Sequence, residues 1–311
     1  MDFNHIPVLL DETIEGLDIK ENGIYVDCTL GGGGHSLEIL KRLGSQGRLV
    51  AIDQDEDALI EAQKRLYDYK DQIYFVKSNY AYLESILDSL NIDKVDGVLM
   101  DIGVSSYQLD EKDRGFSYHQ DAILDMRMDK SQELTARYVV NNYSKEELEN
   151  IFWNYGEEKW GKRIAEFIVD DRTDKEIVST LELVEIIKKA IPKKIRMQGK
   201  HPAKRVFQAL RIEVNKELDV LESTLGIAVD RLKEDGRLAV ITFHSIEDRI
   251  VKTRFLEMAK GCSCPPEFPI CVCNKKEEIE ILTRKPITAS KEELDKNKRA
   301  KSAKLRICRK I

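Results

Sequence analysis

The segment IYVDCTLGGGGHS, residues 24–36, decides the fold of this 311-residue chain. A short apolar run ends in Asp27, four consecutive glycines follow, and His35 opens an amphipathic segment, a pattern that predicts a strand, a tight turn and a helix start. Glycines let the backbone adopt positive φ and approach a ligand closely, and the helix start offers unpaired N–H groups. The next apolar run, RLVAID, ends in Asp53, about 20 residues past the glycines, where a carboxylate can accept both ribose hydroxyls of an adenosine moiety. The sequence therefore predicts a site for a nucleotide-like cofactor.

The glycine spacing bears on which cofactor this is. The fingerprint of NAD-binding proteins is G-x-G-x-x-G, and its third glycine lies inside the helix. Here the four glycines are contiguous, and no glycine stands at the position of that third one. Asp27 would repel a pyrophosphate and attract an amino group or a sulfonium, and S-adenosylmethionine has both. The pattern favours S-adenosylmethionine. An NAD-dependent oxidoreductase and a glycine-rich turn with solvated aspartates are the alternatives.

The bulk composition indicates a folded globular protein with one enlarged domain or two domains, because 42% of the residues are hydrophobic. The N-terminal residues lack the pattern of a signal peptide, and no apolar run approaches the roughly 18 residues that span a bilayer. We therefore predict a cytoplasmic protein without a membrane partner, whose six cysteines are thiols or metal ligands.

Charge is unevenly distributed along the chain, although the net charge is only −6. One run free of acidic residues contains Lys188, Lys189, Lys193, Lys194, Arg196, Lys200, Lys204, Arg205 and Arg211. A second contains Lys296, Lys298, Arg299, Lys301, Lys304, Arg306, Arg309 and Lys310. Such runs suit the phosphates of a nucleic acid, because each neutralised phosphate releases counterions, and a solvated lysine-rich face is the alternative.

Strand and helix patterns alternate as far as residue 101, which predicts a parallel sheet covered by helices on both faces. Asp27, Asp53 and Asp101 each end a predicted strand, so we expect the three carboxylates at one edge of the sheet, where such sheets bind ligands. After Gln108 the pattern predicts a polar loop, DEKDRGFSYHQDAILDMRMDK, and then helices as far as about residue 190, with a capping box of Ser144 and Glu147. A helical region over 205–233 leads back to the strand GRLAVITF, and the segments EIEILT and SAKLRICRK are predicted to pair antiparallel at the sheet edge.

Four cysteines cluster in a short polar stretch. Their spacing, C-x-C, six residues and C-x-C again, fits a tetrahedral zinc site built from Cys262, Cys264, Cys271 and Cys273. Zinc sites more often use C-x-x-C, so cysteines without a metal in a proline-rich turn are the alternative. Cys28 and Cys308 lie in predicted strands and are expected to be small core residues.

Nearly the whole chain resembles the ribosomal RNA small subunit methyltransferase H family. The resemblance is carried, in order, by HIPVLLDETIEGL, DCTLGGGGHS, MDIGVSSYQLD, RGFSY with LDMRMD, NYSKEELENIFWNYGEEKWGKRIAEFI, HPAKRVFQALRIEVNKEL, FHSIEDRIVK, LTRKPI and SAKLR. It implies a class I S-adenosylmethionine-dependent methyltransferase fold of the α/β class, Rossmann-like and mostly parallel with an antiparallel C-terminal edge, carrying an inserted all-α domain. The implied activity is methylation of cytosine N4 in 16S rRNA, at the decoding-centre cytidine of rRNA position 1402.

The resemblance also assigns regions and residues. It implies a methyltransferase domain over 1–108 and 205–311 and an inserted helical domain over 109–204. The implied cofactor-binding residues are Gly33, Gly34, His35, Asp53, Tyr80, Asp101 and Gln108. The family usually has phenylalanine at Tyr80, proline at Tyr107, and a glycine and a proline within HQDAIL, residues 119–124; these departures concern the loop conformation and not the enzyme class.

Asp101 is the candidate catalytic residue, because a carboxylate beside the exocyclic amine would accept its N–H and stabilise charge that develops as the methyl group arrives. Contact with the cofactor alone is the alternative for Asp101. His35 is expected to make a local hydrogen bond and not to act as a base. In the FHSIEDR segment, Phe243 is expected in the core, and Ser245 with Glu247 fits a helix N-cap.

We expect 16S rRNA or the 30S subunit as partner, contacted by the helical insert and the two basic runs. The expected contact residues in the first run are Lys193, Lys194, Arg196, Lys200, Lys204 and Arg205. A non-catalytic RNA-binding or ribosome-assembly factor with the same fold is the functional alternative. The sequence leaves open whether free rRNA or the assembled 30S particle is the substrate, and whether the protein forms a homodimer.

Overall fold

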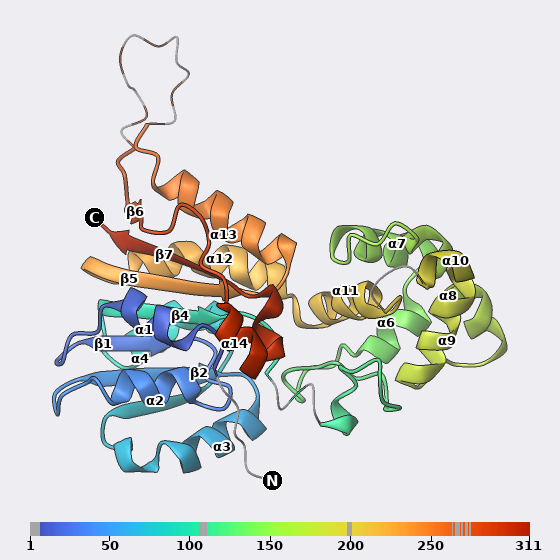
Figure 1. The fold of residues 1–311 in the computed structure, drawn as a ribbon, viewed down its shortest axis with the longest axis horizontal. Coiled ribbons are helices and arrows are strands. Elements are labelled where there is room, and N and C mark those ends of the chain that lie inside the picture. Colours follow the sequence, from blue (N-terminus) through green and yellow to red (C-terminus); the bar gives the residue numbers. More distant parts are fainter. Residues whose placement is uncertain are drawn as a thin grey trace. The chain divides into compact units, whose positions relative to one another are not determined.

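The computed structural model describes residues 7–105, 108, 111–197, 201–262, 264, 268, 270, 273 and 275–311. The chain forms two compact units (Figure 1): Met1–Gly103 with Asp219–Ile311, the sheet unit, and Val104–Leu218, the helical unit. These bounds differ from the expected 108/109 and 204/205. The helix that begins at Lys204 packs within the helical unit, because Val206, Phe207 and Leu210 belong to its core.

The sheet unit contains a seven-stranded sheet in the order β3-β2-β1-β4-β5-β7-β6. The strands are β1 (Ile24–Asp27), β2 (Arg48–Asp53), β3 (Ile73–Lys77), β4 (Val95–Asp101), β5 (Leu232–Thr242), β6 (Ile279–Ile281) and β7 (Lys304–Lys310). The first five pair in parallel, whereas β7 is antiparallel to both β5 and β6. The predicted sheet and its antiparallel C-terminal edge are confirmed.

Alternation along each strand divides the apolar side chains between the two faces of the sheet. Val26, Val98 and Val240 belong to one core cluster, with helices α4 (Leu83–Ser89), α12 (Glu217–Asp230) and α13 (Ser245–Met258). Their chain neighbours Tyr25 and Leu99 belong to the other, with α1 (Leu10–Leu17), α2 (Gly34–Leu40) and α3 (Glu56–Arg65). Both faces are covered, which explains why the strands are apolar almost throughout. The short helices η1 (Tyr67–Tyr69), η2 (Tyr80–Tyr82), α14 (Lys291–Lys296) and η4 (Lys298–Ser302) complete the unit.

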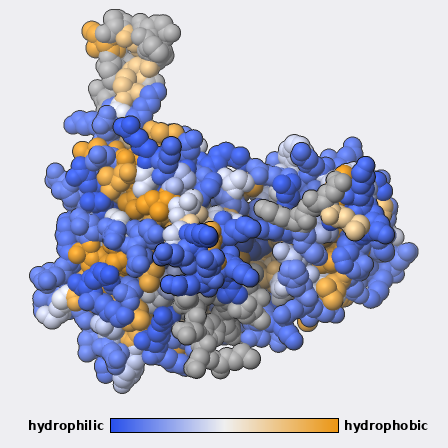
Figure 2. All heavy atoms as spheres, in the orientation of Figure 1, coloured by the Kyte–Doolittle hydropathy of each residue, from blue (hydrophilic) through white to orange (hydrophobic). Residues whose placement is uncertain are grey.

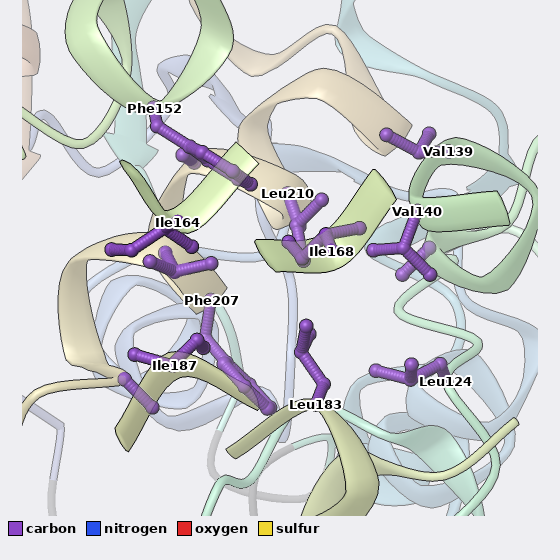
Figure 3. Packing of buried hydrophobic residues seen from close by; sticks show 14 of the residues in the cluster. Leu124, Val139, Val140, Phe152, Ile164, Ile168, Leu183, Ile187, Phe207 and Leu210 are labelled. Carbon is purple, nitrogen blue, oxygen red and sulfur yellow. The ribbon is translucent and has the colours of Figure 1, made fainter. Parts of the chain in front are cut away.

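The helical unit is built from α6 (Ala136–Asn142), α7 (Lys145–Asn154), α8 (Gly161–Asp174), α9 (Thr180–Ala190), α10 (Lys193–Arg196) and α11 (Lys204–Asn215), with η3 (Lys112–Arg114). Its core is shown in Figure 3, where Phe152, Ile164, Leu183 and Phe207 come from four of these helices. Two helix starts carry complete capping boxes: the predicted pair of Ser144 and Glu147 on α7, and a second on α9. Each box satisfies helix N–H groups that have no partner within the helix.

The expected helical region over 205–233 is broken once. Lys216 has a φ of 51°, in the left-handed region, and its N–H donates to the carbonyl of Ile212, which ends α11 before α12 begins. Beside it, Asn215 is buried: its side-chain amide donates to the carbonyls of Met126 and Arg211, and its Oδ1 accepts from the N–H of Met128 at 2.8 Å. These contacts fix the break, and they connect residues too distant in sequence for a local pattern to reveal.

The surface is polar over most of the face seen in Figure 2. This agrees with a charged content of 34%. Among the helices of the described residues, none combines the length and the apolar character that crossing a bilayer requires.

Candidate active site

The glycine loop, residues 31–34, connects β1 to α2 at the carboxyl edge of the sheet. Gly31 and Gly33 have φ values of 49° and 71°, where a side chain would be strained. A Cβ at Gly34 would lie 2.3 Å from Cγ of Pro7, whereas a Cβ at Gly32 would meet nothing within 4 Å. The loop is therefore packed tightly on one side and borders open space at Gly32.

The side chain of Asp27 holds the residues on both sides of this loop. Its Oδ2 accepts from the Ser36 hydroxyl at 2.7 Å and its Oδ1 from the N–H of Thr29 at 3.1 Å. The residue is 1% exposed, and burial raises the pKa of Asp27 to about 6. The Asp27 carboxylate thus binds donors of its own chain, and its expected attraction for a cationic ligand group would act as charge from within the protein.

Asp53 ends β2 and lies at the same edge. Its Oδ2 accepts from the N–H of Gly31 at 2.8 Å and its Oδ1 from the N–H of Asp55 at 2.9 Å, so it positions both the glycine loop and the start of α3. Burial raises the pKa of Asp53 to about 6, with smaller contributions from the charges of Asp55 and Asp27. Each carboxylate oxygen has two lone pairs, so Asp53 keeps acceptor capacity for hydroxyl groups.

Asp101 ends β4 and is anchored by its backbone, whose N–H donates to the Thr29 hydroxyl at 2.7 Å. Its side chain is 24% exposed, and no donor among the described residues reaches its Oδ1. Burial, followed by the charges of Asp27 and Glu247, raises the pKa of Asp101 to about 8. Oδ1 is itself a buried atom, so a ligand would reach the exposed part of the side chain, where the carboxyl group can accept a hydrogen bond.

His35 is buried and makes the expected local contact. Its Nε2 lies 3.0 Å from the carbonyl of Val8, and its Nδ1 lies 3.6 Å from Oδ2 of Asp101. A carbonyl only accepts, so Nε2 carries a proton, and Nδ1 faces Oδ2 of Asp101. His35 thus joins the N-terminal segment to the site and leaves no basic nitrogen facing open space.

The end of β5 completes this edge, and here one expectation fails. The N-cap of α13 is His244 and not Ser245. Oε2 of Glu247 accepts from the N–H groups of Phe243 and His244 at 2.8 and 3.1 Å, and Nδ1 of His244 accepts from the N–H of Glu247 at 3.4 Å. Phe243 packs with the core on one sheet face, as expected, and lies 3.1 Å from the position of a Cβ on Gly103.

The remaining cofactor candidates belong to different units. Tyr80 opens η2 after β3 and packs, partly buried, against the core on one face of the sheet. Gln108 belongs to the helical unit, where its Oε1 accepts from the N–H of Ser105 at 3.0 Å. Stacking of Tyr80 on adenine and binding by Gln108 stay predictions.

Part of the first basic run forms an exposed face of the helical unit, whereas Lys188, Lys189 and Arg211 are paired with acids. Lys193, Lys194 and Arg196 lie on α10, and in the described part of the chain the two lysines form no ion pair. Lys204 and Arg205 begin α11, and Arg205 donates to the carbonyl of Glu157; Lys200 lies outside the described residues. A shallow hollow of about 300 Å³ on this unit is lined by Lys188, Lys193, Arg196, Met197, His201 and Pro202.

The second basic run is divided between three elements. Lys296 ends α14, and Lys298, Arg299 and Lys301 lie on η4. On β7, Lys304 and Arg306 bind Asp248 at 2.8 and 2.7 Å, and Arg309 binds Glu280 at 2.6 Å. Arg306 is 6% exposed. These three paired cations hold the sheet edge together, and contact of the run with RNA stays a prediction.

The cysteines separate into two groups. Cys28 and Cys308 are buried in the sheet unit, as predicted. The sulfur atoms of Cys262, Cys264 and Cys273 all lie within 4.8 Å of one another, and Cys271 lies outside the described residues.

The strand order with an antiparallel β7, the glycine loop after β1 and the carboxylates at the ends of β1, β2 and β4 define a class I S-adenosylmethionine-dependent methyltransferase fold. The sequence model of the MraW methylase family matches residues 2–311, and the chain belongs to this family. This membership decides against the oxidoreductase alternative and confirms the expected resemblance.

Two relatives show how far the similarity extends. The chain is 60% identical over 311 residues to the ribosomal RNA small subunit methyltransferase H of Clostridium botulinum (strain 657 / Type Ba4), with 100% of both chains covered. It is 59% identical over 312 residues to the protein of that name from Finegoldia magna, again with complete coverage of both.

Proposed function

We propose that this protein transfers a methyl group from S-adenosylmethionine to N4 of a cytidine in the 16S rRNA of the small ribosomal subunit. The observation that carries the proposal is identity of about 60% along the entire chain to relatives named as small-subunit rRNA methyltransferases. The resemblance to that family further points to the decoding-centre cytidine at rRNA position 1402. The nitrogen as the acceptor atom and this position are the parts of the proposal that most need a direct test.

The residues at the carboxyl edge fit the cofactor. Gly32 borders open space, Asp53 retains acceptor capacity for two ribose hydroxyls, and Asp101 has an oxygen that no described donor satisfies. When bound, S-adenosylmethionine supplies an electrophilic methyl group on a sulfonium. The buried negative charge of Asp27, near the same loop, would favour a cation there.

The target nitrogen gains a methyl group and must lose one proton. Its lone pair is delocalised into the cytosine ring, so positioning of the amine in line with the methyl group is the main requirement. The ionised Asp101 would accept a hydrogen bond from the N–H and stabilise the positive charge that develops on nitrogen. The base must also be unpaired to reach this edge of the sheet, since the amine is inaccessible inside a helix.

The decisive experiment incubates the protein with methyl-labelled S-adenosylmethionine and 30S subunits from cells that lack it, followed by mass spectrometry of the digested 16S rRNA. We expect label on N4 of one cytidine. Label on another atom or another RNA would contradict the proposal in its specific form. Cofactor binding without transfer to any ribosomal RNA would favour the alternative of a non-catalytic assembly factor.

Replacing Asp53 by alanine should weaken binding of S-adenosylhomocysteine by roughly 1.5 to 3 kcal/mol, because charge-assisted hydrogen bonds to the ribose are lost. Burial raises the pKa of Asp53 to about 6, so binding to the parent should also weaken as the pH falls through that value, where the carboxylate becomes protonated. Calorimetry at pH 5 and pH 8 measures both effects.

Asp55→Ala is the matched control for this measurement. Its side chain caps α3 by accepting from the N–H of Asp57, so its loss should lower thermal stability and leave affinity near that of the parent. Equal affinities for Asp53→Ala and the parent would remove Asp53 from the binding site.

Changing Lys193, Lys194 and Arg196 together to alanine should lower the affinity for a 16S rRNA fragment roughly tenfold or more at low salt. The slope of log affinity against log salt should decrease by about 2, as expected for three phosphate contacts on a single strand. Affinity for S-adenosylhomocysteine should not change. Filter binding across a salt series measures the slope.

The control removes the same number of charges from the same unit. Lys145, Lys175 and Arg137 are each paired with a carboxylate, at 3.7, 2.5 and 2.7 Å, so their replacement by alanine should leave the salt slope near that of the parent. If the two triple variants behaved alike, the exposed lysines of α10 would be only a solvated face.

A further inference from the structure

The segment between α13 and β6 is closed at its base but has no apolar core in its described part. The N–H of Glu278 donates to the carbonyl of Met258 at 2.9 Å, and Nζ of Lys275 donates to the carbonyl of Glu257 at 2.6 Å. Beyond this closure, Phe268 and Ile270 are 52% and 75% exposed. Fixing the backbone of each residue costs about 1–2 kcal/mol, and the exposed side chains of Phe268 and Ile270 do not offset that cost, so this part needs another source of order.

Three cysteine sulfurs come together in this segment. Those of Cys262, Cys264 and Cys273 all lie within 4.8 Å of one another, although Cys262 and Cys273 are separated by ten residues in the sequence. The N–H of Cys264 also points to Sγ of Cys262, at 3.4 Å. N–H groups directed at sulfur stabilise a thiolate, which is the form that binds metal.

The distances distinguish between a disulfide and a metal site. Sγ of Cys262 and Sγ of Cys273 are 3.8 Å apart. A disulfide requires about 2.0 Å, whereas sulfurs about 2.3 Å from a tetrahedral zinc ion lie about 3.8 Å from one another. The observed separation is that of two corners of a zinc tetrahedron.

Burial also sets these cysteines apart. Cys28 and Cys308 are buried and serve as small apolar residues, but Cys262 is exposed, and Cys264 and Cys273 are partly exposed. Cysteine ranks among the most buried residue types, so several of them together near the surface need a chemical reason. Lys260, Lys275 and Lys276 flank the cluster in the sequence and would offset the negative charge of a zinc–thiolate group.

We propose that Cys262, Cys264 and Cys273 bind one zinc ion as thiolates in a structural site that orders the segment between α13 and β6. Cys271, the remaining cysteine of the two C-x-C pairs, lies outside the described residues. The three ligands follow the C-terminal end of α13, whereas the carboxyl edge of the sheet adjoins its N-terminal end, so the metal takes no part in methyl transfer.

The test measures metal content of the full-length protein purified under reducing conditions, by plasma mass spectrometry and by native mass spectrometry. We expect about one zinc per chain in the parent and less than about 0.1 in Cys262→Ser and Cys273→Ser. Cys308→Ala, which removes a buried thiol of the sheet, is the matched control and should keep its zinc. Replacing zinc with cobalt(II) should give the strong visible bands of a tetrahedral thiolate complex in the parent and the control only.

Loss of the metal can be distinguished from loss of the overall fold. Limited proteolysis should cut the segment between residues 259 and 278 faster in the two serine variants or after chelation, while the far-ultraviolet circular dichroism of the protein stays near that of the parent. Absence of zinc and of the cobalt bands in the reconstituted parent would overturn the proposal. So would zinc retained by both serine variants, or a parent mass showing a disulfide under reducing conditions.

Discussion

Replacing Asp101 by asparagine should lower methyl transfer at least about 100-fold, a typical loss for a group that exchanges a proton or hydrogen bond in the transition state. The same replacement should make the folded protein more stable at pH 8. Asp101 has an oxygen that no described donor satisfies, and burial together with Asp27 and Glu247 raises its pKa to about 8. A neutral amide removes this electrostatic cost at the end of β4.

The pH dependence of the stability difference follows from the direction in which the pKa of Asp101 is shifted. A raised pKa means that the folded protein binds the proton more tightly than the unfolded chain, whose Asp titrates near pH 4. The parent therefore loses stability as the pH rises from about 4 to about 8, and the asparagine variant does not. We expect the variant to be more stable by about 2 kcal/mol or more at pH 8 and by little at pH 4. Denaturant unfolding at both pH values measures this.

Activity gives an independent readout of the same group. The carboxylate is the form that accepts from the target amine, so kcat/KM of the parent should rise with pH as far as about 8, and that rise should be absent in the variant. If Asp101 contacts only the cofactor, affinity for S-adenosylhomocysteine should fall by the same factor as the rate. An unchanged affinity with a lower rate would assign Asp101 to the target amine.

Asp96→Asn is a control on the same strand, for which we expect lower stability and unchanged methyl transfer. Asp96 is buried but satisfied, because Oδ2 accepts from the N–H of Ile24 at 2.9 Å and from Nζ of Lys233 at 2.7 Å. Its replacement should cost about 1–3 kcal/mol of stability and leave methyl transfer intact. If Asp101→Asn also lost stability at pH 8, its loss of activity would reflect damage to the fold.

The fold could be predicted largely because its signals are local. Alternating apolar runs define the strands, and Ser144 with Glu147 defines a helix start within four residues. The placement of Asp27, Asp53 and Asp101 at one edge also follows, since each ends a parallel strand and β2, β1 and β4 are neighbours in the sheet.

The parts that could not be predicted depend on contacts distant in sequence. Asp27 had the pattern of a ligand-binding residue, but Ser36 and the backbone of Thr29 occupy its carboxylate. His244 was missed as an N-cap because histidine rarely has this role, and its use here depends on Glu247 binding back to the same turn. Only the folded chain shows which donor meets which acceptor.

The second basic run shows the same limit with a larger energetic consequence. A run of cations without nearby acids in the sequence indicates a nucleic-acid surface, yet acids from other strands and helices pair with three of its cations on β7. Asp248 of α13 binds Arg306 and Lys304 of β7, and the side chains of Asp248 and Arg306 are only 12% and 7% exposed. Burial alone would raise the pKa of Asp248, but hydrogen bonds from Arg306 and Lys304 outweigh it and hold the pKa below its usual value.

Replacing Asp248 by asparagine should therefore cost about 3–5 kcal/mol of stability at pH 7, because a buried guanidinium loses its counter-charge. A depressed pKa stabilises the fold above the unfolded value near 4, so the difference between parent and variant should shrink as the pH falls below that value. Arg309→Ala removes an exposed cation from β7, the strand that holds Arg306, and should change stability little.

Arg306→Met tests whether this strand binds RNA. We expect the variant to have lower stability and unchanged RNA affinity. Unchanged stability with weaker RNA binding would instead show that Arg306 contacts RNA.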